Sequence, residues 1–196
     1  MFQENGFVLD LDYELIDQIC GALASWPEKR QVPVSLRIDR LHFAMSDFIP
    51  RLCAICEKHR VPRSLVCLEV PENVFTGDKV RLARTMRELK RQGFLLLLGG
   101  FGSGWSSLDT LTGYPFDALR LDSSFFGPDA GKKKLIAESI CKMASTLGLR
   151  LSAEDVQTEE QADFLRSIGV DELQGDLYTT TLSAEEFRRS IIDHKG

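Results

Sequence analysis

Acidic, basic and amide side chains recur in this sequence directly after short apolar runs. Five pairs share this position, namely Arg37 and Asp39, Glu69 and Glu72, Arg120 and Asp122, Glu154 and Asp155, and Gln174 and Asp176. Carboxylates brought together can hold divalent cations or act as general acid and base, and arginines beside them can bind phosphate oxygens. The sequence therefore predicts one site built from the ends of several strands.

A glycine-rich run, Leu98-Gly99-Gly100-Phe101-Gly102-Ser103-Gly104, suggests a different chemistry, a loop that cradles phosphate. The run fits neither G-x-G-x-x-G nor G-x-x-x-x-G-K-[ST], the two spacings by which glycine loops hold nucleotide phosphates. This mismatch excludes a dinucleotide-binding or P-loop function for the run.

The elements that must position these residues alternate along the chain. Strand-like runs fall at Val32–Ile38, Leu65–Val70, Phe94–Leu98, Ala118–Leu121, Leu149–Ala153 and Glu172–Leu177. Helical patterns lie at Asp12–Trp26, Ser46–His59, Asp78–Gln92, Ser106–Thr112, Asp129–Leu147, Thr158–Ile168 and Ser183–Ile192. Alternation of strand and helix requires parallel pairing, since a parallel partner is reached only by a crossover.

Local chemistry marks several helix ends. Thr158 and Ser183 each begin a capping box, and Gly93, Gly148 and Gly169 stand where a left-handed residue ends a helix. The first helical pattern is amphipathic, and its expected buried stripe consists of Leu15, Ile19, Leu23 and Trp26.

Two architectures satisfy the alternation, an open doubly wound sheet and a (β/α) barrel. Polar residues after nearly every strand favour the barrel, which gathers its site from many strands, whereas an open sheet concentrates its site at one switch point. Six strands are fewer than the usual eight. We therefore expect an α/β fold, an incomplete or modified TIM (β/α) barrel with six recognisable strands, in a single domain over residues 1–196.

Charge and hydropathy exclude several function classes. The 24 Lys and Arg against 29 Asp and Glu give a net charge of −5, which disfavours duplex nucleic acid as a partner. We interpret the cluster Lys132–Lys134 as a solvated surface. No apolar stretch is long enough for a membrane span and no secretory pattern is visible, so we expect no membrane association and a cytoplasmic location.

The cysteines admit two interpretations, a zinc site and buried thiols. Cys53 and Cys56 have two-residue spacing and His59 follows, but no second ligand pair completes the coordination. Five cysteines scattered along a chain without an export signal indicate reduced thiols in the core.

The motifs together resemble a known family, the EAL domains of bacterial cyclic-di-GMP phosphodiesterases. The glycine run lies where that family has Asp-Asp-Phe-Gly-Thr-Gly, and Leu68-Glu69-Val70-Pro71-Glu72 is similar to its Leu-Glu-Ile-Thr-Glu. Leu119-Arg120-Leu121-Asp122 is similar to its Leu-Lys-Ile-Asp, and Ala153 to Thr158 to its Ala-Glu-Gly-Val-Glu-Thr. Val34 to Asp39 and Gln174-Gly175-Asp176 lie at its Val-Asn-Leu-Ser and Gln-Gly-Tyr, and the ordered set covers almost the whole chain.

The resemblance implies a site that in the family's enzymes holds divalent cations and linearises cyclic-di-GMP. At the matching positions, Glu69, Glu154 and Gln174 are retained, whereas Arg37 replaces an Asn ligand and Arg120 a Lys. Gly99 and Gly100 replace two adjacent Asp residues, and the Glu-Ala-Leu strand that names the family would lie before Met1. A guanidinium about 4 Å from a dication would be repelled by about 8 kcal/mol at an effective dielectric constant of 20.

We therefore expect a catalytically inactive, degenerate EAL-like module of cyclic-di-GMP signalling that needs no metal cofactor. Its expected partners are cyclic-di-GMP, bound through Arg37, Arg120 and Asp122, and another protein or a second copy. The alternative is an active phosphodiesterase that uses Mg²⁺ or Mn²⁺. An unrelated barrel enzyme with Glu69 and Glu154 as acid and base is a third hypothesis.

Three structural expectations follow. Arg37 should form an ion pair with Glu69 across neighbouring strand ends. Asp39 and Asp122 should cap the loops that they begin. The first and last of six strands would leave unpaired sheet edges, which predicts self-association, most simply as a two-fold dimer.

Overall fold

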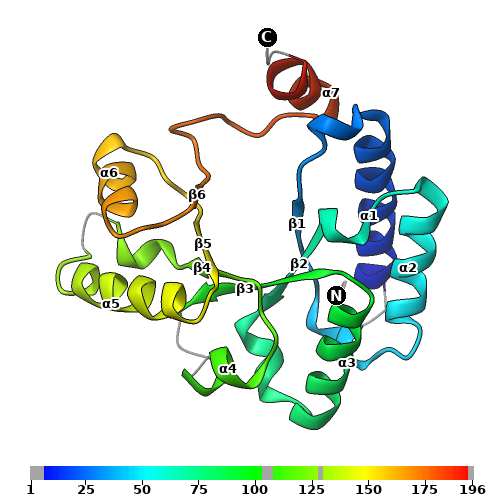
Figure 1. Ribbon diagram of the computed structural model, residues 1–196, viewed down its shortest axis with the longest axis horizontal. Helices are drawn as coiled ribbons and strands as arrows, with labels where there is room; N and C mark the ends of the chain where they lie inside the picture. Colours follow the sequence, from blue (N-terminus) through cyan, green and yellow to red (C-terminus); the bar gives the residue numbers. More distant parts are fainter. Residues whose placement is uncertain (1–6, 103–107, 128–129, 194–196) are drawn as a thin grey trace. The chain divides into compact units, whose positions relative to one another are not determined.

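The computed structural model describes residues 7–102, 108–127 and 130–193 (Figure 1). Its six strands form one sheet in the order β1-β2-β3-β4-β5-β6. The strands are β1 (Val34–Arg37), β2 (Val66–Pro71), β3 (Leu95–Phe101), β4 (Ala118–Leu121), β5 (Arg150–Ala153) and β6 (Glu172–Leu173). Parallel pairing joins β1 to β2 and, in turn, β3 to β4, β4 to β5 and β5 to β6. The alternation in the sequence thus predicted the number, order and direction of the strands.

The α-helices follow the predicted pattern with shifted ends. They are α1 (Phe7–Ser25), α2 (Phe48–His59), α3 (Lys79–Arg91), α4 (Leu108–Gly113), α5 (Lys133–Thr146), α6 (Glu159–Ser167) and α7 (Ala184–Phe187), which continues as a π-helical turn over Arg188–Ile192. Both predicted capping boxes are present, at Thr158 with Gln161 and at Ser183 with Glu186. The starts predicted at Ser106 and Asp129 lie outside the described residues.

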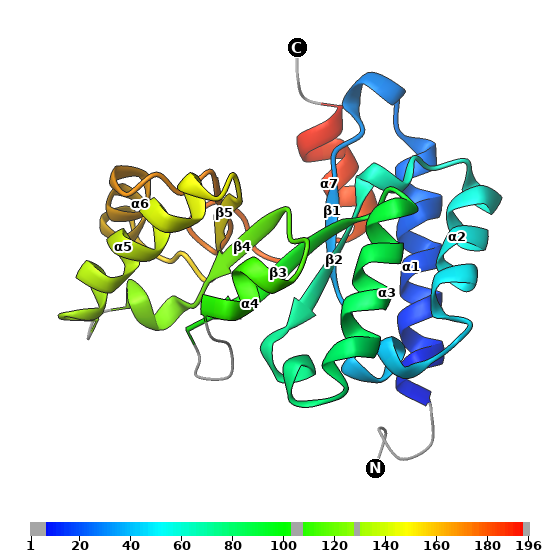
Figure 2. The same ribbon diagram turned by 60° about the horizontal axis from the view of Figure 1, so that its bottom comes forward.

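The chain divides into two compact units. The first unit contains residues 1–96 and 182–196, and the second contains residues 97–181. In the first unit, α1, α2 and α3 lie beside β1 and β2 (Figure 2). In the second, α5 and α6 lie beside β4 and β5.

The core of the first unit forms between its helices and strands. Every residue of β2 from Val66 to Val70 is buried, as expected for a strand with a neighbour on each side. On α1 the buried stripe is Tyr13, Ile16, Cys20 and Leu23, whereas Leu15 is 49% exposed. Of the predicted stripe, Leu23 and Trp26 are buried as expected and Ile19 is half-buried. The prediction for Leu15 was wrong, because the adjacent Ile16 occupies the core position.

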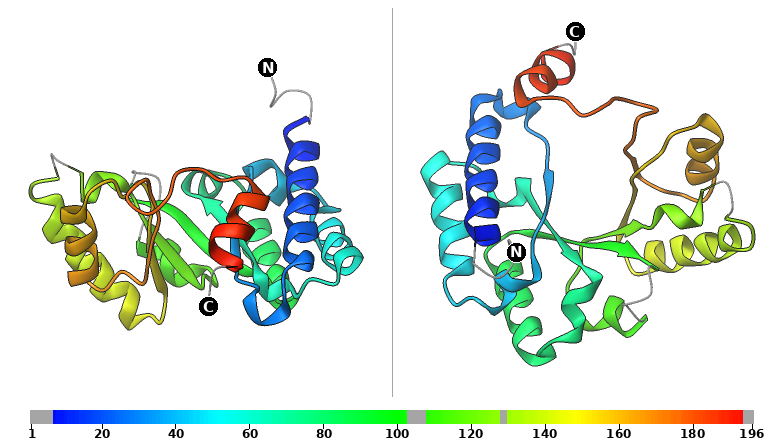
Figure 3. Two further views of the ribbon diagram at one scale, coloured as in Figure 1. Left: turned by 90° about the horizontal axis from the view of Figure 1, so that it is seen from above. Right: turned by 180° about the vertical axis from the view of Figure 1, so that it is seen from behind.

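The C-terminal helix belongs to the first unit. The rings of Trp26 and Phe187 stack with centroids 5.5 Å apart, and Ile192 is buried. Arg30 donates a hydrogen bond to the carbonyl oxygen of Ile192. Figure 3 shows α7 beside the C-terminal end of α1. These contacts fasten the end of the chain to its first helix.

The cysteines lie mostly in the core, as expected from the sequence. All five cysteines are free, and Cys20, Cys56, Cys67 and Cys141 are buried. No helix in the described part of the chain is both long and apolar enough to cross a membrane.

Candidate functional site

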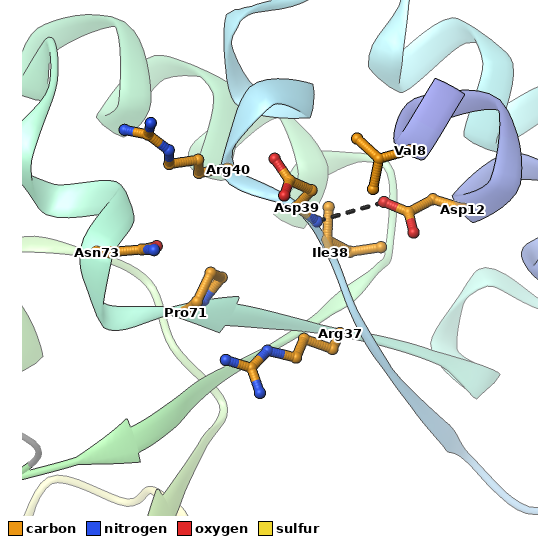
Figure 4. Close-up of a pocket in the computed structure, with 8 residues that line it drawn as sticks. All are labelled: Val8, Asp12, Arg37, Ile38, Asp39, Arg40, Pro71 and Asn73. Atoms are coloured by element: carbon orange, nitrogen blue, oxygen red, sulfur yellow. Dashed lines mark hydrogen bonds between the residues drawn. The ribbon is translucent and has the colours of Figure 1, made fainter. Parts of the chain in front are cut away.

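The end of β1 opens onto a pocket in the first unit (Figure 4). Arg37 is the last residue of β1, and its side chain is exposed. Asp39 accepts a hydrogen bond from the amide of Leu41 at 2.9 Å, which begins a 3₁₀ turn and confirms its capping role. The pocket has a volume of about 320 Å³ and is lined by Val8, Asp12, Arg37, Ile38, Asp39, Arg40, Pro71 and Asn73.

A polar pair joins the wall of this pocket to the core, because Asp12 lines the pocket and His42 is buried. The Nε2 atom of His42 is 2.9 Å from an Oδ2 atom of Asp12, and that same oxygen accepts a 3.4 Å hydrogen bond from the amide of Asp39. His42 is fully buried between the rings of Tyr13 and Phe48. Burial lowers the pKa of His42, and the carboxylate of Asp12 opposes that shift. Asp12 therefore ties α1 to the loop that leaves β1.

The sequence analysis missed this pair. Its only signals were a carboxylate next to the apolar stripe of α1 and a histidine between Leu41 and Phe43. A further contact holds the same region, because the guanidinium carbon of Arg51 lies 3.7 Å from the centre of the Tyr13 ring. Burial raises the pKa of Tyr13 to about 12. The phenol is therefore neutral near pH 7.

The predicted ion pair between Arg37 and Glu69 does not form. The two residues are directly opposed in the register of β1 and β2. Glu69 is only 6% exposed, whereas the side chain of Arg37 is exposed and pairs with no carboxylate among the residues that the structure describes. Glu69 is buried, so the guanidinium would have to give up its hydration to reach that carboxylate, and it remains in solvent instead. The cation of Arg37 is left facing the pocket.

In the second unit, the glycines of the candidate site interrupt β3. The register between β3 and β4 shifts between Leu98 and Phe101, which makes Gly99 and Gly100 an irregular, bulge-like segment. Gly100 has a φ of +64°, and a Cβ atom added there would meet nothing within 4 Å. At Gly100 the chain therefore presents only backbone atoms beside open space, whereas the matching position of the family pattern has an aspartate carboxylate.

Arg120 and Glu154 meet at the ends of β4 and β5. Nη1 of Arg120 donates a 2.9 Å hydrogen bond to Oε2 of Glu154, and Arg120 is 8% exposed. Asp122 accepts a hydrogen bond from the amide of Ser124 at 2.9 Å, so it caps the next turn as predicted. Asp155 follows with a φ of +61°, a left-handed backbone that costs a non-glycine residue free energy.

Gln174 lies just beyond β6, in a loop that passes close to the loop following β5. The amide of Gln174 donates to the carbonyl of Ala153 at 2.9 Å, and the amide of Val156 donates to the carbonyl of Gln174 at 3.1 Å. The side chain of Gln174 is exposed. The structure thus places Glu154 and Gln174 on adjoining loops of this unit.

The predicted site residues lie at or near the carboxyl ends of strands. Arg37, Asp39, Glu69 and Glu72 belong to the first unit, and the others belong to the second. Within the described ranges, no group of three or more His, Cys, Asp or Glu side chains is arranged to hold a metal ion.

Six parallel strands in sequence order, with helices between successive strands, define a partial (β/α)-barrel fold. The EAL domain model matches residues 1–181, and the chain belongs to the EAL domain family. The PaMucR phosphodiesterase, solved as a c-di-GMP complex, superposes with a TM-score of 0.89 at 25% identity over 95% of this chain and 77% of that chain. This similarity confirms the predicted fold class.

Two curated relatives are longer proteins. Signaling protein YkoW of Bacillus subtilis is 28% identical over 194 residues, which are 97% of this chain and 24% of that protein. The bifunctional diguanylate cyclase/cyclic di-GMP phosphodiesterase MucR of Pseudomonas aeruginosa is 25% identical over 96% of this chain and 28% of its own length. The chain therefore spans about a quarter of the length of these relatives.

Proposed function

We propose that this EAL domain is a catalytically inactive module of c-di-GMP signalling that binds the dinucleotide without a metal ion. The observation that supports the proposal best is the exposed Arg37 guanidinium, which lines a pocket at the end of β1 and has no carboxylate partner in the described part of the chain. A guanidinium can bind two phosphodiester oxygens at once, so it suits this ligand.

The side chains present do not fit a pair of divalent cations. Such a pair needs anionic oxygen ligands, and a bridging carboxylate in particular. Gly99 and Gly100 have no side-chain oxygen, and Glu154 already accepts a hydrogen bond from Arg120. The positive charge of Arg37 would oppose a cation in its own unit.

Arg37 and Arg120 differ in what they can offer a phosphate. Arg120 is buried and bonded to Glu154, whereas Arg37 is exposed. We therefore assign phosphate binding to Arg37, and to Arg120 the task of holding Glu154. Neighbouring Asp39 does not compete for the guanidinium, because it caps the following turn.

Calorimetric titration with c-di-GMP tests this proposal. We expect binding by the unaltered chain to be the same with and without Mg²⁺, and at least tenfold weaker in Arg37→Ala. Arg91→Ala removes an exposed arginine on α3 that does not line the pocket, and it should bind normally. Binding that requires Mg²⁺, or equal binding by both variants, would contradict the assignment.

A further inference from the structure

Two helices of the first unit have opposite charge. Helix α1 has four carboxylates, Asp10, Asp12, Glu14 and Asp17, and neither Lys nor Arg. Helix α3 has six cationic side chains against one carboxylate, a net charge of +5. Since the whole chain has a net charge of −5, α3 is a basic helix in an otherwise acidic protein. None of the α1 carboxylates pairs with a cation of α3 in the described structure.

The basic face of α3 consists of Val80, Arg84 and Arg87. These residues lie within about 60° of one another around the helix, directly opposite the buried side. Val80 is 64% exposed, both arginines are exposed, and neither arginine has an ion-pair partner among the described residues. Like charges three residues apart destabilise a helix. Arg84 and Arg87 are therefore free to pair with carboxylates outside the described residues.

The exposed face of α1 consists of Asp10, Leu11, Glu14 and Leu15. Leu11 is 55% and Leu15 is 49% exposed, and the side chain of Asp10 is 75% exposed. Asp10 lies 3.6 Å from Arg51 across an exposed pair, and Glu14 accepts only a hydrogen bond from Gln18. This face therefore has two apolar side chains beside two carboxylates. Glu14 has no cationic partner in the described structure, and Asp10 has only the exposed pair with Arg51.

The two faces complement each other in both charge and hydropathy. Carboxylates four residues apart on α1 match arginines three residues apart on α3, and Leu11 and Leu15 offer an apolar surface to Val80. A lipid bilayer or nucleic acid is anionic over an area far wider than one helix, so the net charge of −5 opposes both as partners.

We propose that a second copy of this chain docks here, with the α1 face of one copy against the α3 face of the other. The contact joins unlike faces, so either two copies exchange both contacts or a longer assembly grows. This surface is distinct from the sheet edges, and its use does not depend on c-di-GMP.

Sedimentation velocity with charge-swapped variants tests the contact. At micromolar concentration and low salt, the unaltered chain should associate, and association should weaken at least tenfold at 500 mM salt. Arg84→Glu with Arg87→Glu should sediment as a monomer, as should Asp10→Lys with Glu14→Lys. An equimolar mixture of the two variants should associate again, because each contact then joins opposite charges.

A matched control reverses the charge of two lysines outside the proposed contact, Lys132→Glu with Lys133→Glu. This variant should associate like the unaltered chain. The proposal is overturned if the unaltered chain stays monomeric, or if both swapped variants still associate, as assembly through sheet edges predicts. It is also overturned if the mixture remains monomeric, or if a monomeric chain binds phosphatidylserine vesicles or duplex DNA through Arg84 and Arg87.

Discussion

Replacement of Gly175 by alanine probes the loops that hold Glu154 and Gln174. A Cβ atom at Gly175 would lie 2.2 Å from the carbonyl oxygen, 2.4 Å from the nitrogen and 2.8 Å from the carbonyl carbon of Val156. All three are backbone atoms, so no side-chain rotation relieves the overlap. The two loops must separate.

The cost follows from what that separation breaks. The amide of Val156 donates to Gln174, and its carbonyl accepts from Leu177, both at 3.1 Å. Forcing a methyl group into a packed site costs about 1–3 kcal/mol, and leaving buried backbone groups unpaired adds about 1–3 kcal/mol. We therefore expect Gly175→Ala to lower the free energy of unfolding by about 3–5 kcal/mol.

Urea unfolding followed by circular dichroism measures this loss. With a slope of about 2–3 kcal/mol per molar urea, the midpoint should fall by about 1–2 M. Gly169→Ala is the matched control, because Gly169 also has positive φ, at +84°, but a Cβ atom there meets nothing within 4 Å. That control should lose only about 1–2 kcal/mol. Equal losses in the two variants would refute the reasoning from close backbone contact.

Three further predictions concern the site and its surroundings. Asp155→Gly should raise the free energy of unfolding by about 0.5–1 kcal/mol in the same assay, because it relieves a left-handed backbone at an exposed residue, and a loss would contradict this. Restoring both carboxylates with Gly99→Asp and Gly100→Asp should not produce turnover of c-di-GMP, since Arg37 still stands where the family pattern has an Asn ligand; product formation with Mn²⁺ would contradict this. Burial lowers the pKa of His42, so the unfolded chain takes up a proton near pH 6.5 while the folded chain does not. Stability should therefore be complete above that pH and fall below it by up to about 1.4 kcal/mol per pH unit, and His42→Phe should reduce this fall in urea titrations at pH 7.5 and 5.5.

The strands and helices were predictable because their signals are local. β4 lies at Ala118–Leu121 as predicted, and Gly93, Gly148 and Gly169 have positive φ at the ends of α3, α5 and α6. β6 is shorter than the predicted strand Glu172–Leu177, since only Glu172 and Leu173 pair with β5. The backbone of Gln174 and its neighbours is satisfied by loop contacts instead.

Contacts between particular side chains were less predictable. The ion pair between Arg37 and Glu69 was expected from register alone, yet register fixes Cα positions and leaves a long guanidinium side chain free to remain solvated. The basic face of α3 escaped notice because its arginines alternate with core residues, whereas the run Lys132–Lys134 is contiguous. A search for like charges at spacings of three and four would have found it.

Product analysis after incubation with c-di-GMP tests the central claim most directly. The chain, in a preparation shown by titration to bind the dinucleotide, is incubated with Mg²⁺ or Mn²⁺, and nucleotides are separated by chromatography. The proposed inactive site predicts that c-di-GMP is recovered unchanged, with neither its linear product nor GMP formed. Metal-dependent appearance of the linear dinucleotide would contradict the proposal that this domain is catalytically inactive.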